Sequence, residues 1–169
     1  YSSPIKSEAQ QAPEQRTQHQ SLADGQGTAI IASVAAMSGQ SVEGCMARLL
    51  LVLAALGGFT GVALGAFAAH GLKARLSPEY LAVFQTGTHY QLIHSLALLA
   101  VALLILHTPD RLLRASGTLF AFGILLFSGS LYLLTLTGVT ALGMLTPFGG
   151  LAFLCGWLCL GVAAWRMGR

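Results

Sequence analysis

Histidines, hydroxyls and amides are the side chains that could carry chemistry in the long apolar part of this sequence. Tyr90 and His94 are four residues apart, as are Ser128 and Tyr132, so each pair lies on one face of a helix. Such groups can hydrogen-bond one another across helices, bind a neutral solute or, in the case of paired histidines, ligate haem iron. The candidate polar cluster consists of His70, Tyr90, Gln91, His94, Ser128, Ser130, Tyr132 and Thr146.

Three classes of function are compatible with this cluster. The first, which we favour, is a structural, accessory-subunit or assembly protein that takes no cofactor, because polar residues commonly stabilise helix interfaces in membranes. The second is a small-solute transporter or channel, in which Pro147, Gly149 and Gly150 would interrupt the last helix. The third is a site for haem or another cofactor held by His70 and His94, which we expect at similar depth.

Neither an enzyme nor a metal site is predicted. The sequence has no set of nucleophile, base and acid, no paired carboxylates and no phosphate-binding loop. Cys155 and Cys159 are one helical turn apart, with no His, Asp or Glu in the same apolar segment, so we expect them to pack as small side chains. The spans described below also carry no Asp, Glu, Lys or Arg, which argues against proton pumping and ion relay.

The composition indicates where the cluster must lie. Of 169 residues, 54% are hydrophobic and 9% are charged, whereas a soluble domain carries about a quarter charged residues. A soluble globular protein is therefore excluded, and helices that cross a membrane must position the cluster.

Four segments reach the roughly 20 apolar residues that a membrane crossing needs, and we predict an all-α membrane protein built as a bundle of four transmembrane helices. The uncharged stretch between Arg114 and Arg166 is too long for one crossing, so we divide it at residues 137–140. Before the second span, residues 78–88 are mixed in polarity and follow Ser77, a typical cap, which predicts an interfacial helical segment. The predicted spans are 49–70, 89–106, 115–136 and 142–165.

Residues 1–45 differ from the rest of the chain. They are rich in Gln, Ser, Ala and Gly, with Tyr1 as the only aromatic residue, so they cannot bury enough apolar surface to fold. We interpret them as a disordered tail that need not be native. Residues 46–169 are then the membrane domain, since Met46 resembles a natural start followed almost at once by an apolar run.

The positive charges predict the orientation, because cytoplasmic loops are enriched in Lys and Arg. Lys73 and Arg75 lie on one side of the predicted bundle and five arginines on the other, so both termini are predicted in the cytoplasm. The expected partners are the lipid bilayer and either a membrane protein complex or further copies of this chain, not nucleic acid. The five arginines are Arg48, Arg111, Arg114, Arg166 and Arg169.

Small residues indicate how the helices pack. Gly57, Gly61 and Gly65 recur every four residues in the first span, and Gly156 lies in the fourth. In lipid, small residues let helix backbones approach closely. We therefore predict that these four glycines lie at helix contacts.

Five blocks of sequence coincide with the candidate cluster and its surroundings. They are GAFAAHG (65–71), YQLIH (90–94), LFSGSLY (126–132), TPFGG (146–150) and GW (156–157). In this order they resemble the blocks of the YgdD-like small inner-membrane proteins, a family also called domain of unknown function 423, whose animal relatives are called transmembrane protein 256. The resemblance covers residues 46–169, with Ala68 where the family often has Gly. It implies a multi-pass protein of the bacterial inner membrane, without an established activity.

Overall fold

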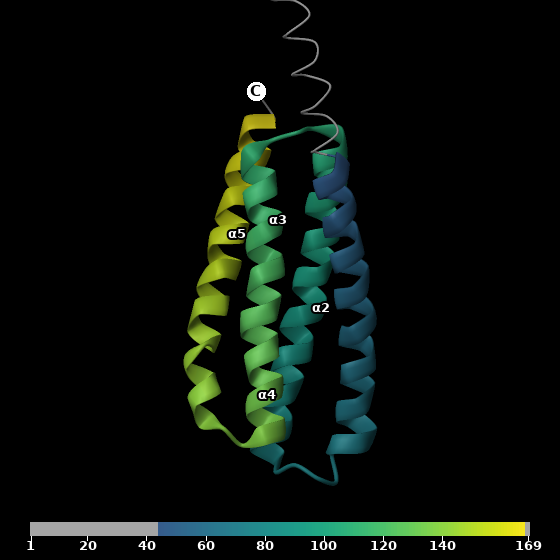
Figure 1. The fold of residues 1–169 in the computed structure, drawn as a ribbon, viewed down its shortest axis with the longest axis vertical. Coiled ribbons are helices and arrows are strands. Elements are labelled where there is room, and N and C mark those ends of the chain that lie inside the picture. The colour runs from purple at the N-terminus through teal and green to yellow at the C-terminus, as the bar shows by residue number, and fades with distance from the viewer. Residues whose placement is uncertain (1–43, 168–169) are drawn as a thin grey trace, which may run out of the picture. The chain divides into compact units, whose positions relative to one another are not determined.

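The computed structural model describes residues 44–167. Within this range it contains four helical segments long and apolar enough to cross a membrane, and no strand. Figure 1 shows the four segments side by side, each running opposite to the one before it. The predicted all-α bundle of four transmembrane helices is confirmed. The predicted tail of residues 1–45 lies outside the described residues except for Gly44 and Cys45, which are helical.

The first helical segment, Gly44–Leu72, ends in a π-helical turn and connects to the second through a short turn. The π-helix η2 spans Ala68–Leu72, and α2 spans Pro78–His107. The Ser77 hydroxyl accepts a hydrogen bond from the backbone N–H three residues further on, at 3.3 Å. Pro78 occupies the first turn, where the N–H that it lacks would have no helical partner. Ser77 and Pro78 therefore begin α2 as the sequence predicts.

α2 is long enough to cross the whole bilayer. Its 30 residues correspond to about 45 Å of helix, and a bilayer with its headgroup layers is about 40–45 Å thick. Residues 78–88, predicted as an interfacial helical segment, form the first turns of α2 and continue into the span without a break. The segment is therefore helical but is not a separate element.

The third segment, Arg111–Thr137, contains a π-helix near its middle. It consists of α3 (Arg111–Gly123), the π-helix η3 (Ile124–Ser128) and α4 (Gly129–Thr137). The Asp110 carboxylate caps its start by accepting backbone N–H groups two and three residues further on, at 2.6 and 3.3 Å. A π turn joins residues five apart instead of four, so η3 changes which side chains beyond it face α2 and α5.

The connection to the last helix is longer than predicted, and that helix is unbroken. Gly138 ends α4 in the left-handed conformation, with a φ of 74°. The 3-10 helix η4 then spans Thr140–Met144, and α5 spans Thr146–Met167. Pro147 lies in the first turn of α5, where a missing N–H removes no helical hydrogen bond. The interruption that we expected for a transporter is therefore absent from α5.

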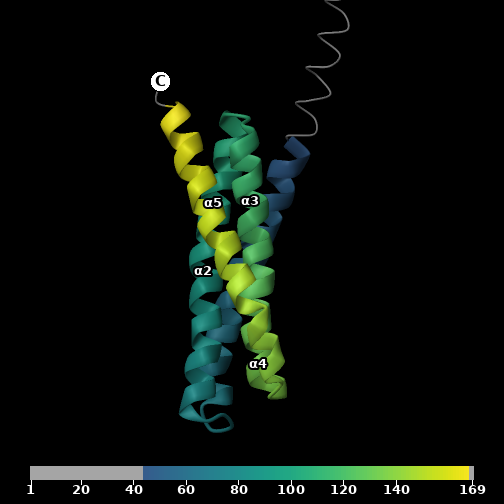
Figure 2. The same cartoon turned by 90° about the vertical axis from the view of Figure 1, so that its left-hand side faces the viewer.

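α2 lies at the centre of the packing, and the first helical segment lies at its edge. α2 contacts α3, η3 and α4, while α3 and η3 contact α5, an arrangement that Figures 1 and 2 show from two sides. In its most apolar window 44% of α2 is buried, against 17% of the first segment. The main core includes Leu50, Leu98, Ile105, Phe120 and Phe153.

Three of the four glycines predicted to pack helices lie in close contacts. A Cβ atom at Gly57 or Gly61 would collide with side chains of α2, at 2.8 Å from Leu92 in the case of Gly61. At Gly156 it would lie 2.7 Å from a phenylalanine ring of α3. Nothing lies within 4 Å of the corresponding position at Gly65, so no other helix packs there. A four-residue stripe rotates by about 40° at each step around a helix of 3.6 residues per turn, which turns Gly65 away from α2.

Candidate functional site

Gln91 joins three helical segments through its side-chain amide. Its Nε2 donates to the Gly57 carbonyl at 2.8 Å and to the Thr60 hydroxyl at 2.7 Å, both in the first segment. Its Oε1 accepts from the Tyr132 hydroxyl of α4 at 2.8 Å. Only 5% of Gln91 is exposed. Because a polar group in the hydrocarbon region must find its partners within the protein, this arrangement, the Gln91 junction, stabilises the contact of the three segments.

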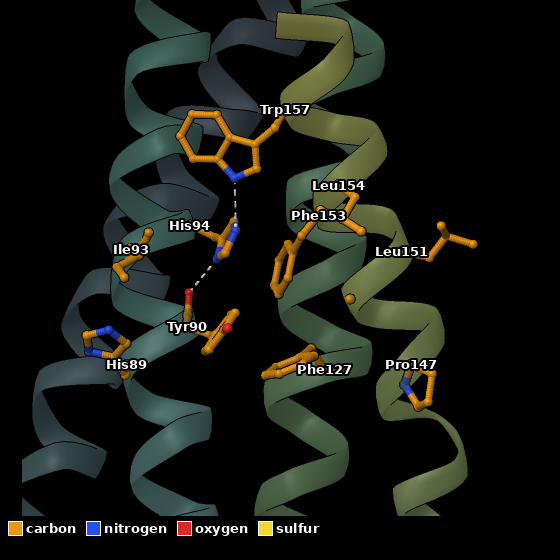
Figure 3. Close-up of a pocket in the computed structure, with 11 residues that line it drawn as sticks. His89, Tyr90, Ile93, His94, Phe127, Pro147, Leu151, Phe153, Leu154 and Trp157 are labelled. Carbon is orange, nitrogen blue, oxygen red and sulfur yellow. Dashed lines mark hydrogen bonds between the residues drawn. The ribbon is translucent and has the colours of Figure 1, made fainter. Parts of the chain in front are cut away.

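His94 makes a corresponding connection between α2 and α5 (Figure 3). Its Nδ1 lies 2.8 Å from the Tyr90 carbonyl oxygen, and the Trp157 indole nitrogen lies 3.2 Å from its Nε2. Since an indole N–H can only donate, Nε2 accepts and the ring proton is on Nδ1. His94 is therefore a neutral imidazole with both nitrogens in hydrogen bonds. Its ring also stacks on Phe153, with centroids 3.5 Å apart.

Hydroxyl groups connect the third and fourth segments. The Ser130 hydroxyl of α4 lies 2.9 Å from the Thr146 hydroxyl at the start of α5, and Ser116 of α3 donates to the Gly156 carbonyl of α5 at 2.9 Å. Ser116 and Thr60 were not predicted as members of the cluster. Thr60 adjoins the glycine stripe of the first span, a signal that it faces another helix, whereas Ser116 adjoins a single glycine, Gly117, that belongs to no such stripe.

His70 lies apart from the other predicted residues. Gly57 faces Ser95 across the antiparallel contact, a register that places His70 level with residue 82 of α2. That position is about 18 Å along the helix from His94. The expectation that His70 and His94 lie at similar depth is therefore wrong, because the turn between the two helices follows closely after His70. They cannot ligate the same haem iron in this arrangement, and the His70 side chain is exposed.

Two further predicted residues have no side-chain hydrogen bond within the described part of the chain. Ser128 is fully buried, yet its hydroxyl has no partner there, and the same holds for the Ser95 hydroxyl. Tyr90 contacts Phe127 through its ring, with centroids 4.6 Å apart, but 39% of Tyr90 is exposed. The structure thus brings five of the eight residues into hydrogen bonds between helices and leaves His70, Tyr90 and Ser128 outside them.

Two open grooves border these connections. The groove between α2 and α5, here the aromatic groove, has a volume of about 800 Å³ and carries the rings of Tyr90, Phe127, Phe153 and Trp157 (Figure 3). The second groove, of about 550 Å³, lies between the first segment and the third and includes Gln91 among its lining residues. The hydrogen bond between His94 and Trp157 therefore borders the aromatic groove, and the Gln91 junction borders the second groove.

The arrangement is electrically neutral. None of the Asp, Glu, Lys and Arg residues in the range 44–167 is buried. The same range holds no group of three or more side chains that could bind a metal ion. What the site offers chemically is hydrogen bonding between neutral groups and contact with aromatic rings.

Known proteins are similar to this chain over the region that carries the site. A family profile described as a protein of unknown function (DUF423) matches residues 64–150, a range that contains the first four blocks. A UPF0382 membrane protein of Staphylococcus epidermidis is 44% identical over 116 residues, which are 69% of this chain and 94% of that protein. A UPF0382 membrane protein of Haemophilus influenzae is 46% identical over 116 residues, which are 69% of this chain and 93% of that protein.

A third relative is described by its location. The UPF0382 inner membrane protein YgdD of Escherichia coli is 40% identical over 122 residues, which are 72% of this chain and 93% of that protein. No solved structure matches the chain. With this identity over nearly the full length of its relatives, the chain belongs to the DUF423 family of membrane proteins of unknown function.

Proposed function

We propose that the protein is a structural, accessory-subunit or assembly protein of the bacterial inner membrane. The observation that supports this role is the Gln91 junction, a buried amide whose hydrogen bonds all go to neighbouring helices. His94 is engaged in the same way between α2 and α5. Polar groups engaged with one another hold a bundle together and are not free to coordinate a transported solute.

The outer surface of the bundle supports interaction with other membrane components. The first segment is the least buried of the four described segments, and Val52, Leu56, Phe59 and Val62 are exposed along it. In a membrane such a surface contacts lipid or another apolar helix. The partners that we propose are the bilayer itself and a membrane protein complex or further copies of this chain.

We also propose that both termini face the cytoplasm. Arg48, Arg111 and Arg166 lie at one end of their helical segments, while Lys73 and Arg75 follow the opposite end of the first segment. This distribution supports a cytoplasmic location for the arginine-rich end. The exposed Trp165 next to Arg166 is typical of a side chain at the membrane interface.

The test of the accessory role is the assembly state of the protein extracted at its native expression level. We expect native mass spectrometry from lipid nanodiscs to detect a complex with a fixed ratio of this chain to another membrane protein or to further copies. Gln91→Ala should dissociate that complex because it loosens the bundle. Gln85→Ala, an exposed change on the same helix, should leave the complex intact.

The opposite outcome identifies a different class of protein. A wild-type chain that is always monomeric, together with solute uptake into proteoliposomes that depends on it, would overturn the accessory role in favour of a transporter.

A further inference from the structure

We propose that the aromatic groove binds a lipid-soluble ligand with a flat, conjugated ring that carries carbonyl or hydroxyl oxygens and an apolar tail, the chemistry of the isoprenoid quinones. The groove lies on the α2–α5 side of the bundle, away from the contact of α2 with the first segment. This binding site goes beyond the proposed accessory function and does not depend on it.

The size and the walls of the groove suit such a ring. Its volume of about 800 Å³ lies within the roughly 300–1,000 Å³ of small-molecule sites. The ring centroids of Tyr90 and Phe127 are 4.6 Å apart, and those of Phe127 and Phe153 are 5.6 Å apart. Aromatic rings attract one another at these spacings. A flat conjugated ring entering the groove would extend this array of rings.

The Tyr90 hydroxyl is the polar group that remains available to a ligand. Figure 3 shows the Tyr90 ring pointing into the groove, between α2 and α5. Its hydroxyl has no hydrogen-bond partner within residues 44–167. Of the other polar side chains that line the groove, His94 and Trp157 are bonded to each other, and Figure 3 shows the His89 ring on the side of α2 away from α5. An unpaired hydroxyl in an apolar environment is unfavourable, and a carbonyl oxygen on a bound ring would accept a hydrogen bond from it.

The surroundings of Tyr90 fit a ligand with a polar head and an apolar tail. Tyr90 lies 12 residues after the start of α2, about 18 Å along the helix, so in a bilayer of about 40–45 Å it lies within the hydrocarbon core. A polar group at this depth must find its partner in the protein or in a ligand. The polar ring of a ligand at Tyr90 would leave its tail in the hydrocarbon, beside apolar side chains such as Ile93 and Leu154.

Two other classes of membrane ligand satisfy this groove less well. The acyl chain of a phospholipid has no flat face and would leave the Tyr90 hydroxyl unpaired. A quaternary ammonium headgroup is also attracted to aromatic rings, but no Asp or Glu lines the groove to balance its charge.

A substitution of Gly150 can fill the groove without disturbing the helix contact. Gly150 lines the groove, and a Cβ atom there would lie 3.9 Å from the Phe127 ring, an ordinary contact. Gly150→Leu therefore places a branched side chain in the space that the ligand would occupy. Gly161→Leu is the matched control, because Gly161 lies on the same helix outside the groove and nothing lies within 4 Å of its Cβ position.

The chain contains a fluorescent reporter in the wall of this groove. Its two tryptophans are Trp157 and Trp165, so Trp165→Phe leaves only the one that lines the groove. Decylubiquinone, a quencher of indole fluorescence, is titrated into this variant in detergent micelles. We expect saturable quenching, an apparent affinity at least tenfold weaker with Gly150→Leu, and no change with Gly161→Leu. Tyr90→Phe, which removes only the hydroxyl, should weaken binding about threefold to tenfold.

Two results would overturn the proposal. Quenching that rises without saturation and is equal in the Gly150→Leu and Gly161→Leu proteins would mean that the quinone only partitions into the micelle. Loss of the saturable quenching when a short-chain phospholipid or tetramethylammonium is added would mean that the ligand class is wrong. Melting temperatures of all variants, measured by circular dichroism, separate these results from loss of the fold.

Discussion

Replacing Gln91 with alanine is expected to lower the free energy of unfolding by about 2 kcal/mol, because hydrogen bonds between membrane helices contribute about 0.6 kcal/mol each and this amide makes three. The substitution also leaves the Tyr132 hydroxyl without its acceptor. Equilibrium unfolding in mixed detergent micelles measures the effect.

Gln85→Ala is the control for this prediction. Gln85 lies on the same helix and is exposed, so its replacement should change the free energy of unfolding by less than about 0.5 kcal/mol. Equal stability of the two variants would contradict the structural role of the amide. Retained stability with a lost cellular phenotype would instead point to a functional site at Gln91.

Gly149→Ala is expected to destabilise the protein by about 3 kcal/mol, the upper part of the usual range for overpacking. A Cβ atom at Gly149 would lie 2.7 Å from the Phe127 Cβ and 2.8 Å from its Cα. These atoms belong to or adjoin the backbone of η3, so they cannot move away by a change of side-chain rotamer. The contact between α5 and η3 must open instead, and thermal unfolding in detergent detects the loss.

The neighbouring Gly150 provides the control for this prediction. At Gly150 the same added methyl group would meet the Phe127 ring at 3.9 Å, so Gly150→Ala should leave stability within about 0.5 kcal/mol of the wild type. A melting temperature for Gly149→Ala as high as that for Gly150→Ala would contradict the close approach of α5 and η3 at Gly149.

The four helices could be predicted because their cause is local. Uncharged segments bounded by residues such as Arg114 and Arg166 are long enough to cross a bilayer, and every backbone group in the hydrocarbon must be bonded within a helix. The start of α2 at Ser77 also follows from capping by the nearest side chain. These features need no knowledge of how one helix sits against another.

The partners within the site could be predicted only in part, since they depend on the rotation and register of neighbouring helices. The spacing of Tyr90, Gln91 and His94 along the chain indicates a shared region of one helix. It does not indicate that Gln91 bonds to Thr60, or that His94 turns the other way to accept from Trp157.

Two further differences between the prediction and the structure also arise from the rotation and register of the helices. The π-helix η3 changes which face of the third segment packs against its neighbours. It lies within a uniform apolar run, so no local sequence pattern predicts it. The sequence predicts His70 near His94 because both lie in the outer half of their predicted spans, but the antiparallel register set by Gly57 and Ser95 separates them.

The structural role of the polar cluster is tested most directly by a double-mutant cycle of Gln91→Ala and Tyr132→Phe. Tyr132→Phe removes the hydroxyl but keeps the ring, whose centroid lies 4.8 Å from that of Phe84. With unfolding free energies of the wild type, both single variants and the double variant, we predict a coupling of about 0.6 to 1.7 kcal/mol between the two side chains. Additive effects, with a coupling of zero, would contradict the conclusion that this hydrogen bond helps to hold α2 and α4 together.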